Sequence, residues 1–111
     1  MLVRFPNLMQ SYAMEHFKEA AKEAEKIMRG VFERTPLQKN EHLSAIYGAD
    51  IWLKREDLSP VRSYKLRGAF NAMRKQDKNK LFVAASAGNH AQGVAYMCKH
   101  SGVKGTIFMP V

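Results

Sequence analysis

The second half of the chain alternates short apolar segments with segments of helical periodicity, and this alternation restricts the possible folds more than any other feature. The expected strands are IWLK, LFVAA and GTIFMPV, and the expected helices between them are KLRGAFNAMRKQ and NHAQGVAYMCKH. LFVAA is apolar throughout, which is typical of a parallel strand buried on both faces. With right-handed crossovers, residues 50–111 form a β-α-β-α-β unit, so the sequence predicts an α/β fold with an open parallel sheet.

The first half of the chain has a simpler pattern. Apolar residues at spacings of three and four predict an amphipathic helix over residues 11–29, which Gly30 ends. The segment ERTPLQKN is expected to be a connector with a turn at its Thr-Pro pair. A short helix over residues 41–47 should follow, with Asn40 as its N-cap and Gly48 as its end.

Two regions are therefore expected, an N-terminal helical segment over residues 1–33 and an α/β part over residues 34–111. The last predicted strand runs to Val111 with no later helix to cover the sheet. The sequence thus predicts an incomplete three-layer domain with leading helices, as in an N-terminal piece of a larger protein.

Charge and composition narrow the function classes. The net charge is +8, but no nucleic-acid-binding signature accompanies it, and aromatic residues are not interleaved with the basic ones. A solvated basic face is expected, with no nucleic-acid partner. No apolar run approaches the roughly 20 residues that span a bilayer, and no secretory signal is recognisable, so we expect a cytoplasmic protein without membrane contact. The single cysteine, Cys98, agrees with a reducing compartment, and no histidine has metal-ligand spacing.

The helix KLRGAFNAM places one lysine in an unusual position. At about 100° per residue, the polar side chains gather in a stripe that should face solvent, whereas Lys65 falls on the opposite side. Lys65 lies there over a strip of small residues. The polar stripe contains Arg67, Asn71, Arg74 and Lys75, and the small strip contains Gly68, Ala69 and Ala72.

Two interpretations of Lys65 are open. In one, Lys65 is an ordinary surface lysine. In the other, Lys65 has a lowered pKa, helped by Arg62 and Arg67, and acts as an amine nucleophile.

The segment SAGNHAQGVAY lies where a buried strand is expected to end and a helix to begin. Ligands of open α/β sheets bind at the carboxyl ends of strands, and the free N–H groups of a helix amino end attract anions. Ser86, Gly88 and Asn89 occupy this turn, so a carboxylate could bind there. A capped helix with glycines for packing explains the same pattern.

The two segments together carry a resemblance. SYKLRGA, followed about twenty residues later by SAGNHAQGVA, resembles the fold-type II (tryptophan synthase beta-like) enzymes that depend on pyridoxal 5'-phosphate. TPLQ, WLKREDL and IFMP occur in matching order around them, and the resemblance runs from Arg34 to Val111. Within this family, the likeness is greatest to the threonine dehydratases, also called threonine deaminases.

The resemblance implies roles for individual residues. Lys65 matches the lysine that holds the cofactor covalently and moves the Cα proton of the substrate. Tyr64 matches an aromatic residue packed near the cofactor, and Asn89 matches the residue that hydrogen-bonds its ring hydroxyl. The residues that match the cradle for the substrate carboxylate are Ser86, Ala87, Gly88, Asn89 and His90, of which His90 is expected to contribute its backbone amide.

The implied activity is deamination of an amino acid, L-threonine, to 2-oxobutanoate and ammonia, as in isoleucine biosynthesis. The complete family member is expected to be a homo-oligomer, and this chain alone is expected to be inactive. Alternatives are a serine/threonine racemase, another β-eliminating relative, or a truncated product without catalysis. Related racemases have a serine where this chain has Ala87, which favours elimination. Cys98 is expected to be a core thiol, and Asp57 to brace the loop before Lys65.

Overall fold

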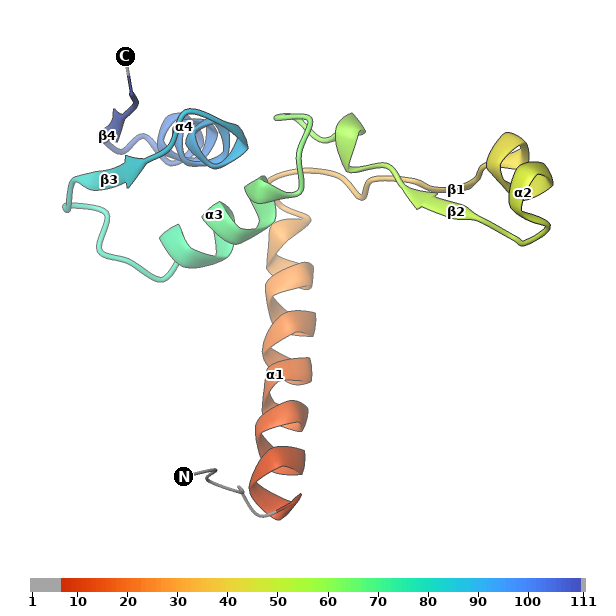
Figure 1. Ribbon diagram of the computed structural model, residues 1–111. Coiled ribbons are helices and arrows are strands. Elements are labelled where there is room, and N and C mark those ends of the chain that lie inside the picture. The colour runs from red at the N-terminus through yellow and green to blue at the C-terminus, as the bar shows by residue number, and fades with distance from the viewer. Residues whose placement is uncertain (1–6, 111) are drawn as a thin grey trace.

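The computed structural model describes residues 7–110, and of residues 7–13 only the backbone. A long helix, an arm (residues 37–54) and a body (residues 65–108) meet near one point and extend in different directions (Figure 1). The Cα radius of gyration of 18.2 Å therefore exceeds the roughly 13 Å of a compact domain of this length. The helices are α1 (Asn7–Met28), α2 (Glu41–Tyr47), the 3-10 helix η1 (Glu56–Leu58), α3 (Lys65–Met73) and α4 (Asn89–Ser101), and the strands are β1 (Leu37–Lys39), β2 (Trp52–Lys54), β3 (Phe82–Ala85) and β4 (Gly105–Phe108).

Helix α1 is the expected amphipathic helix, although it begins earlier than predicted, at Asn7. From Met14 onward, where side chains are described, only the last turns of α1 pack on other residues: Ala24 and Met28 are buried, whereas Met14 and Phe17 are 65% and 69% exposed. Within residues 14–28, the apolar stripe of α1 is thus covered only where the helix meets α3.

The arm corrects two expectations. The segment ERTPLQKN contains a strand, β1, and is not only a connector. Strand β2, predicted to belong to the parallel sheet, pairs antiparallel with β1 in a separate two-stranded sheet. A backbone hydrogen bond from Arg55 N to Pro36 O, 2.9 Å long, extends this pairing beyond the strands. IWLK is therefore a strand, as predicted, but in the other sheet.

Helix α2 connects the two strands of the arm, and its predicted ends are confirmed. The side chain of Asn40 accepts a hydrogen bond of 2.8 Å from Leu43 N, and Gly48 takes the left-handed conformation (φ 60°) that ends the helix. No residue of α2 is buried. Local capping, rather than packing, accounts for where this helix begins and ends.

The body contains the predicted parallel pair, β3 beside β4, with Phe82 opposite Gly105 and Ala85 opposite Phe108. Helix α4 packs on both strands, and α3 packs on α4. The expectation that LFVAA is buried on both faces is wrong for these residues. Burial alternates along β3, because the helices cover the side of Phe82 and Ala84 and leave Val83 60% exposed.

The core lies between α3, α4 and the end of α1. Leu66 is completely buried at its centre. The other buried members are Met28, Phe32, Ala69, Phe70, Met73, Val94, Met97 and Cys98.

The polar stripe of α3 does not face solvent as predicted. The chain just after α1 packs on this side, where the Arg67 guanidinium carbon lies 5.7 Å from the centre of the Phe32 ring. Arg74 Nη1 lies 4.0 Å from a carboxylate oxygen of Glu23 on α1. Arg67 and Arg74 are half-buried, and only Lys75 remains exposed.

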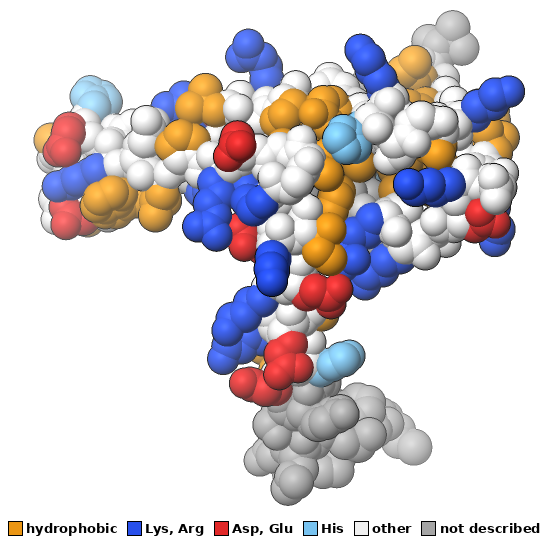
Figure 2. Space-filling model, turned by 180° about the vertical axis from the view of Figure 1, so that it is seen from behind, with side chains coloured by type: hydrophobic (Ala, Val, Ile, Leu, Met, Phe, Trp, Pro, Cys, Tyr) orange, Lys and Arg blue, Asp and Glu red, His pale blue; other side chains and the backbone are white. Residues whose placement is uncertain are grey.

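Surface charge follows no single element. Figure 2 shows Lys and Arg side chains spread over the arm, the body and α1 on the face opposite to that of Figure 1. Among the described residues, no helix combines the length and apolar character needed to cross a bilayer. Within the same residues, no three His, Cys, Asp or Glu side chains are placed to hold a metal ion.

Candidate functional site

Lys65 is the first residue of α3, and a closed loop fixes the backbone before it. Ser63 N donates to Ser59 Oγ (2.9 Å), and the same hydroxyl donates to Ser63 O (3.1 Å). Ser63 Oγ in turn accepts a hydrogen bond of 3.2 Å from Lys65 N. Both serines are buried, so this loop has little freedom and the start of α3 is well defined.

Arg62, three residues before Lys65, has a left-handed backbone with φ of 53°. An arginine seldom adopts this conformation, which costs about 1 kcal/mol or more and persists only where surrounding contacts impose it. Its N–H donates to Ser59 O (2.9 Å), which closes the same turn. Backbone strain is thus stored next to the residue that the sequence identifies as reactive.

A polar cluster holds α3 from the side of the arm. Glu56 accepts two hydrogen bonds from Arg67, of 2.7 Å from Nη2 and 3.0 Å from Nε. Thr35 Oγ1 donates to the same carboxylate at 2.6 Å. The Thr35 carbonyl oxygen accepts a short hydrogen bond from Lys54 Nζ. The charge of Arg67 is thereby paired with Glu56, rather than free to act on Lys65 as the sequence suggested.

The charges in this cluster favour the ionised form of Glu56. Hydrogen bonds from Arg67 hold the pKa of Glu56 below its usual value of 4.5, against the raising effect of partial burial. The bracing role expected of Asp57 belongs to Glu56, because Asp57 is exposed and pairs with Arg55 at 2.7 Å. No sequence signal pointed to Glu56, since its partners are 11 and 21 residues away.

The turn before α4 and the first two residues of α4 contain the other predicted site residues. Ser86 N donates to Phe108 O (3.0 Å), which attaches the turn to the end of β4. Gly88 N donates to Ser86 Oγ at 3.2 Å. Ala87, Gly88, Asn89 and His90 are exposed, and no side chain caps α4. The first N–H groups of α4 therefore remain free for an anion.

The amino ends of α3 and α4 lie close together. Gly93, one turn after Asn89, packs against the backbone of Lys65. Neither helix has an acidic residue in its first turn, so no side-chain carboxylate on these turns opposes an anion between them. Tyr64 is 60% exposed, and Lys65 Nζ lies 5.3 Å from the centre of its ring. The structure thus places the backbone of Lys65 against Gly93, one turn into α4, and the amine of Lys65 beside the ring of Tyr64.

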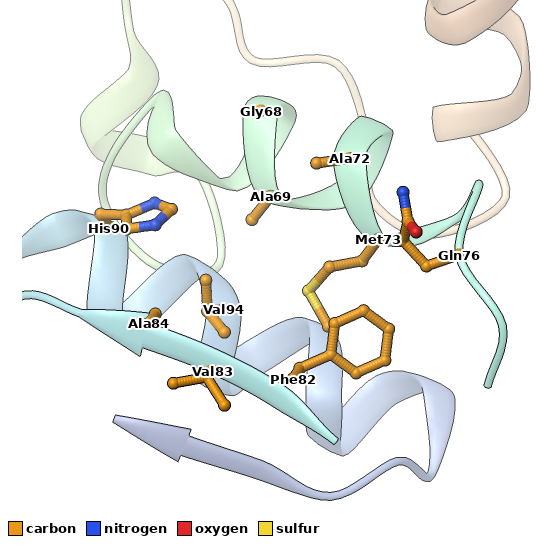
Figure 3. A pocket seen from close by; sticks show the side chains of 10 residues that line it. All are labelled: Gly68, Ala69, Ala72, Met73, Gln76, Phe82, Val83, Ala84, His90 and Val94. Carbon is orange, nitrogen blue, oxygen red and sulfur yellow. The ribbon is translucent and has the colours of Figure 1, made fainter. Parts of the chain in front are cut away.

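The small strip of α3 lines an apolar cavity of about 250 Å³ between α3, β3 and α4 (Figure 3). Lys65 is not among its lining residues. The ring of His90, to which the sequence gave no role, forms part of the wall. The remaining lining residues are Gly68, Ala69, Ala72, Met73, Gln76, Phe82, Val83, Ala84 and Val94.

Cys98 is a core thiol, as predicted. It is 8% exposed, and its burial raises the pKa of the thiol, which disfavours the reactive thiolate.

Known proteins share both the sequence and the fold. The chain is 55% identical over 87 residues to the L-threonine dehydratase biosynthetic IlvA of Bacillus subtilis, and 56% identical over 84 residues to that of Corynebacterium glutamicum. These alignments cover 75% and 73% of this chain but only 20% and 19% of the relatives. The chain thus spans about a fifth of the length of the curated relatives it matches.

Solved structures confirm the expected fold type. A threonine deaminase from T.th. superposes with a TM-score of 0.77 at 36% identity, over 84% of this chain and 33% of its own. Maize serine racemase superposes with a TM-score of 0.76 at 28% identity, over 83% and 30%. The family described as pyridoxal-phosphate dependent enzyme matches residues 28–111. This match covers most of the sequence, including both candidate helix ends, and the chain belongs to the pyridoxal-phosphate dependent enzymes.

Proposed function

We propose that this chain carries the lysine half of the active site of a biosynthetic threonine dehydratase, which converts L-threonine to 2-oxobutanoate and ammonia. One observation carries the proposal: the backbone of Lys65, the first residue of α3, packs against Gly93, one turn into the uncapped helix α4. The similarity to biosynthetic threonine dehydratases at 55% identity supports the choice of substrate and a role in isoleucine synthesis.

The residues present fit pyridoxal phosphate, the cofactor of this family. Lys65 has an exposed amine to bind the cofactor aldehyde, and Tyr64 offers an exposed aromatic face beside that amine. Asn89 is exposed at the start of α4, where its amide can meet a ring hydroxyl. When bound, the cofactor supplies an electron sink for the negative charge left on Cα after proton removal.

The substrate carboxylate is assigned to the start of α4. Free N–H groups at Asn89 and His90, together with the positive end of the helix dipole, favour a negative charge there. Ser86 fixes this turn through its hydrogen bonds to Gly88 and Phe108. The cradle is thus held by the sheet, so it can orient the substrate.

Lys65 is assigned the proton transfer at Cα, since its amine would accept this proton when uncharged. The side chain of Ala87 has no group that could accept or donate a proton from the cradle side. Proton transfer by one group favours elimination over racemisation, which would need a second group on the other face of the substrate.

The proposal includes a boundary between a leading segment, residues 1–33, and the enzyme domain from residue 34 onward. The reduced, buried Cys98 is consistent with a cytoplasmic location. A homo-oligomeric complete enzyme is part of the same proposal.

Covalent trapping tests the assignment of Lys65. The chain is incubated with pyridoxal phosphate, reduced with borohydride and digested, and the adduct at each lysine is quantified by mass spectrometry. We expect the adduct at Lys65 to exceed that at exposed Lys22 on α1, and Lys65→Arg to leave Lys22 unchanged. Equal adduct at both lysines would contradict the assignment.

Substrate choice is tested in a chimera. Residues 28–111 replace the matching segment of the Bacillus subtilis relative, and release of 2-oxobutanoate from L-threonine is assayed. We expect an active chimera that loses activity on Lys65→Ala. Formation of D-allothreonine, the Cα epimer of L-threonine, in place of 2-oxobutanoate would favour the racemase.

A further inference from the structure

Helices α3 and α4 approach each other most closely at Gly93. A Cβ atom at this position would lie 3.2 Å from the carbonyl oxygen of Lys65 and 3.3 Å from its carbonyl carbon. It would also lie 3.4 Å from Cβ of Ala69, one turn further along α3. Such contacts are tighter than ordinary packing, so the hydrogen of Gly93 is what allows α4 to touch the backbone of Lys65.

We propose that Gly93 is a positioning residue, which sets the distance between the amine of Lys65 and the amino end of α4. This inference rests on the proposed function of Lys65 as the covalent cofactor-binding residue. Gly93 is buried against α3, so its assigned effect runs through the backbone of Lys65.

Because of where Gly93 lies, a substitution there should change the geometry of the candidate site. It lies one turn after Asn89, so the contact fixes the backbone of Lys65 relative to the exposed turn that precedes α4. A methyl group here must push the two helices apart by a few tenths of an ångström. A misplacement of about 1 Å near a reacting group can cost about a hundredfold, so a displacement of a few tenths of an ångström should cost about threefold.

Other contacts keep α3 from simply tilting away. The buried Ser59–Ser63 loop holds the chain just before Lys65, and the Glu56–Arg67 pair holds the other side of the same turn. With these contacts intact, the displacement must be shared by the first turn of α3, including Lys65, and the turn around Asn89.

The chain contains a matched control for this argument. Gly68 is also a helical glycine close to Lys65, but a Cβ atom built there meets nothing within 4 Å. Both glycines gain about 1 kcal/mol of helix propensity on substitution by alanine. Any difference between Gly93→Ala and Gly68→Ala therefore comes from the contacts of the new Cβ atom with the backbone of Lys65 and with Ala69.

The experiment measures site-specific trapping in the intact 111-residue chain. Pyridoxal phosphate condenses with a lysine amine and releases water, and borohydride then supplies hydride that makes the carbon–nitrogen bond permanent. The ratio of adduct at Lys65 to adduct at Lys22 is measured for the wild type, Gly93→Ala and Gly68→Ala. Circular dichroism checks that each variant is folded.

We expect Gly93→Ala to remain folded and to lower the Lys65 to Lys22 ratio by about threefold or more, whereas Gly68→Ala keeps the wild-type ratio. A folded Gly93→Ala variant with the wild-type ratio would overturn the inference while leaving the function of Lys65 intact. If Gly93→Ala does not fold, the measurement is repeated in the double variant Gly68→Ala/Gly93→Ala, which gains helix propensity. Failure of both to fold would show that Gly93 acts on stability and would also overturn the inference. A wild-type ratio near one would instead remove the function proposed for Lys65.

Discussion

Different interactions stabilise the body and the arm of this molecule. The body packs apolar side chains of α3 and α4, together with the end of α1, around Leu66, whose side chain is completely inaccessible to solvent. The arm buries no residue of α2 and exposes large apolar side chains, with Tyr47 70% and Trp52 55% exposed. Its shape instead depends on strand pairing, helix caps and ion pairs such as Lys39 with Asp50 at 2.9 Å.

This difference shows how the candidate site is positioned. Lys65 and Asn89 lie on the two helices of the body, and packing fixes these helices relative to each other. The arm contacts the polar cluster of Thr35, Glu56 and Arg67 through Lys54 of β2, whose amine donates to the Thr35 carbonyl oxygen. Changes in the body should therefore act on folding, and changes in the cluster should act on how α3 is held.

The largest effect should come from the same substitution made in the two regions. Leu66→Ala leaves a cavity at the centre of the body and should lower the free energy of unfolding by about 3 kcal/mol. Leu37→Ala in β1 removes a side chain that is 61% exposed, and should cost less than about 1 kcal/mol. Urea denaturation followed by circular dichroism measures both. Equal losses would mean that the arm and the body share one apolar core.

The next largest effect should come from the cluster that joins the two regions. Glu56→Gln removes the charge that pairs with half-buried Arg67 and should lower the free energy of unfolding by about 2 kcal/mol. Asp57→Asn is the matched control, because its exposed pair with Arg55 should contribute less than about 1 kcal/mol. If the two variants were equally stable, the cluster would not hold α3.

Acid should weaken the same cluster. Because the pKa of Glu56 in the folded chain is lowered, its ion pair stabilises the fold fully above the usual value of 4.5. This contribution is lost as the pH falls through the lowered pKa, where the folded carboxylate takes up a proton. We expect the stability difference between wild type and Glu56→Gln to be constant above about pH 5 and to shrink below about pH 4. A difference that grew on acidification would contradict this sign.

How far the sequence predicted the structure also differs between the two regions. Periodicity located α3, α4, β3 and β4, because apolar spacing reports directly on which side of an element is buried. Periodicity could not locate β1, since three residues after Pro36 carry no alternation and their partners in β2 lie 13 to 17 residues away. The assignment of β2 to the parallel sheet failed for the same reason, because strand pairing is a tertiary property.

In the candidate site too, some features could be predicted from the sequence and others could not. Motifs identified Lys65 and the turn at Ser86 to Asn89, since each lies within one continuous segment. The contact of Gly93 with Lys65 and the pair of Glu56 with Arg67 could not be predicted, because each joins segments whose separation in space is set by packing. Sequence motifs thus supplied the reactive groups, and the structure supplied what positions them.

The smallest effect should be confined to the arm. Asn40→Ala removes the acceptor for Leu43 N at the start of α2 and should cost about 1 kcal/mol. Since no residue of α2 is buried, this loss should appear as faster amide hydrogen exchange in α2, with exchange in α3 and α4 unchanged. Asn79→Ala, in the exposed loop before β3, is the control for the same change without a helix cap. If exchange at Leu66 accelerated together with that at Leu43, the arm would unfold with the body, and the polar cluster would transmit stability between them as well as hold α3.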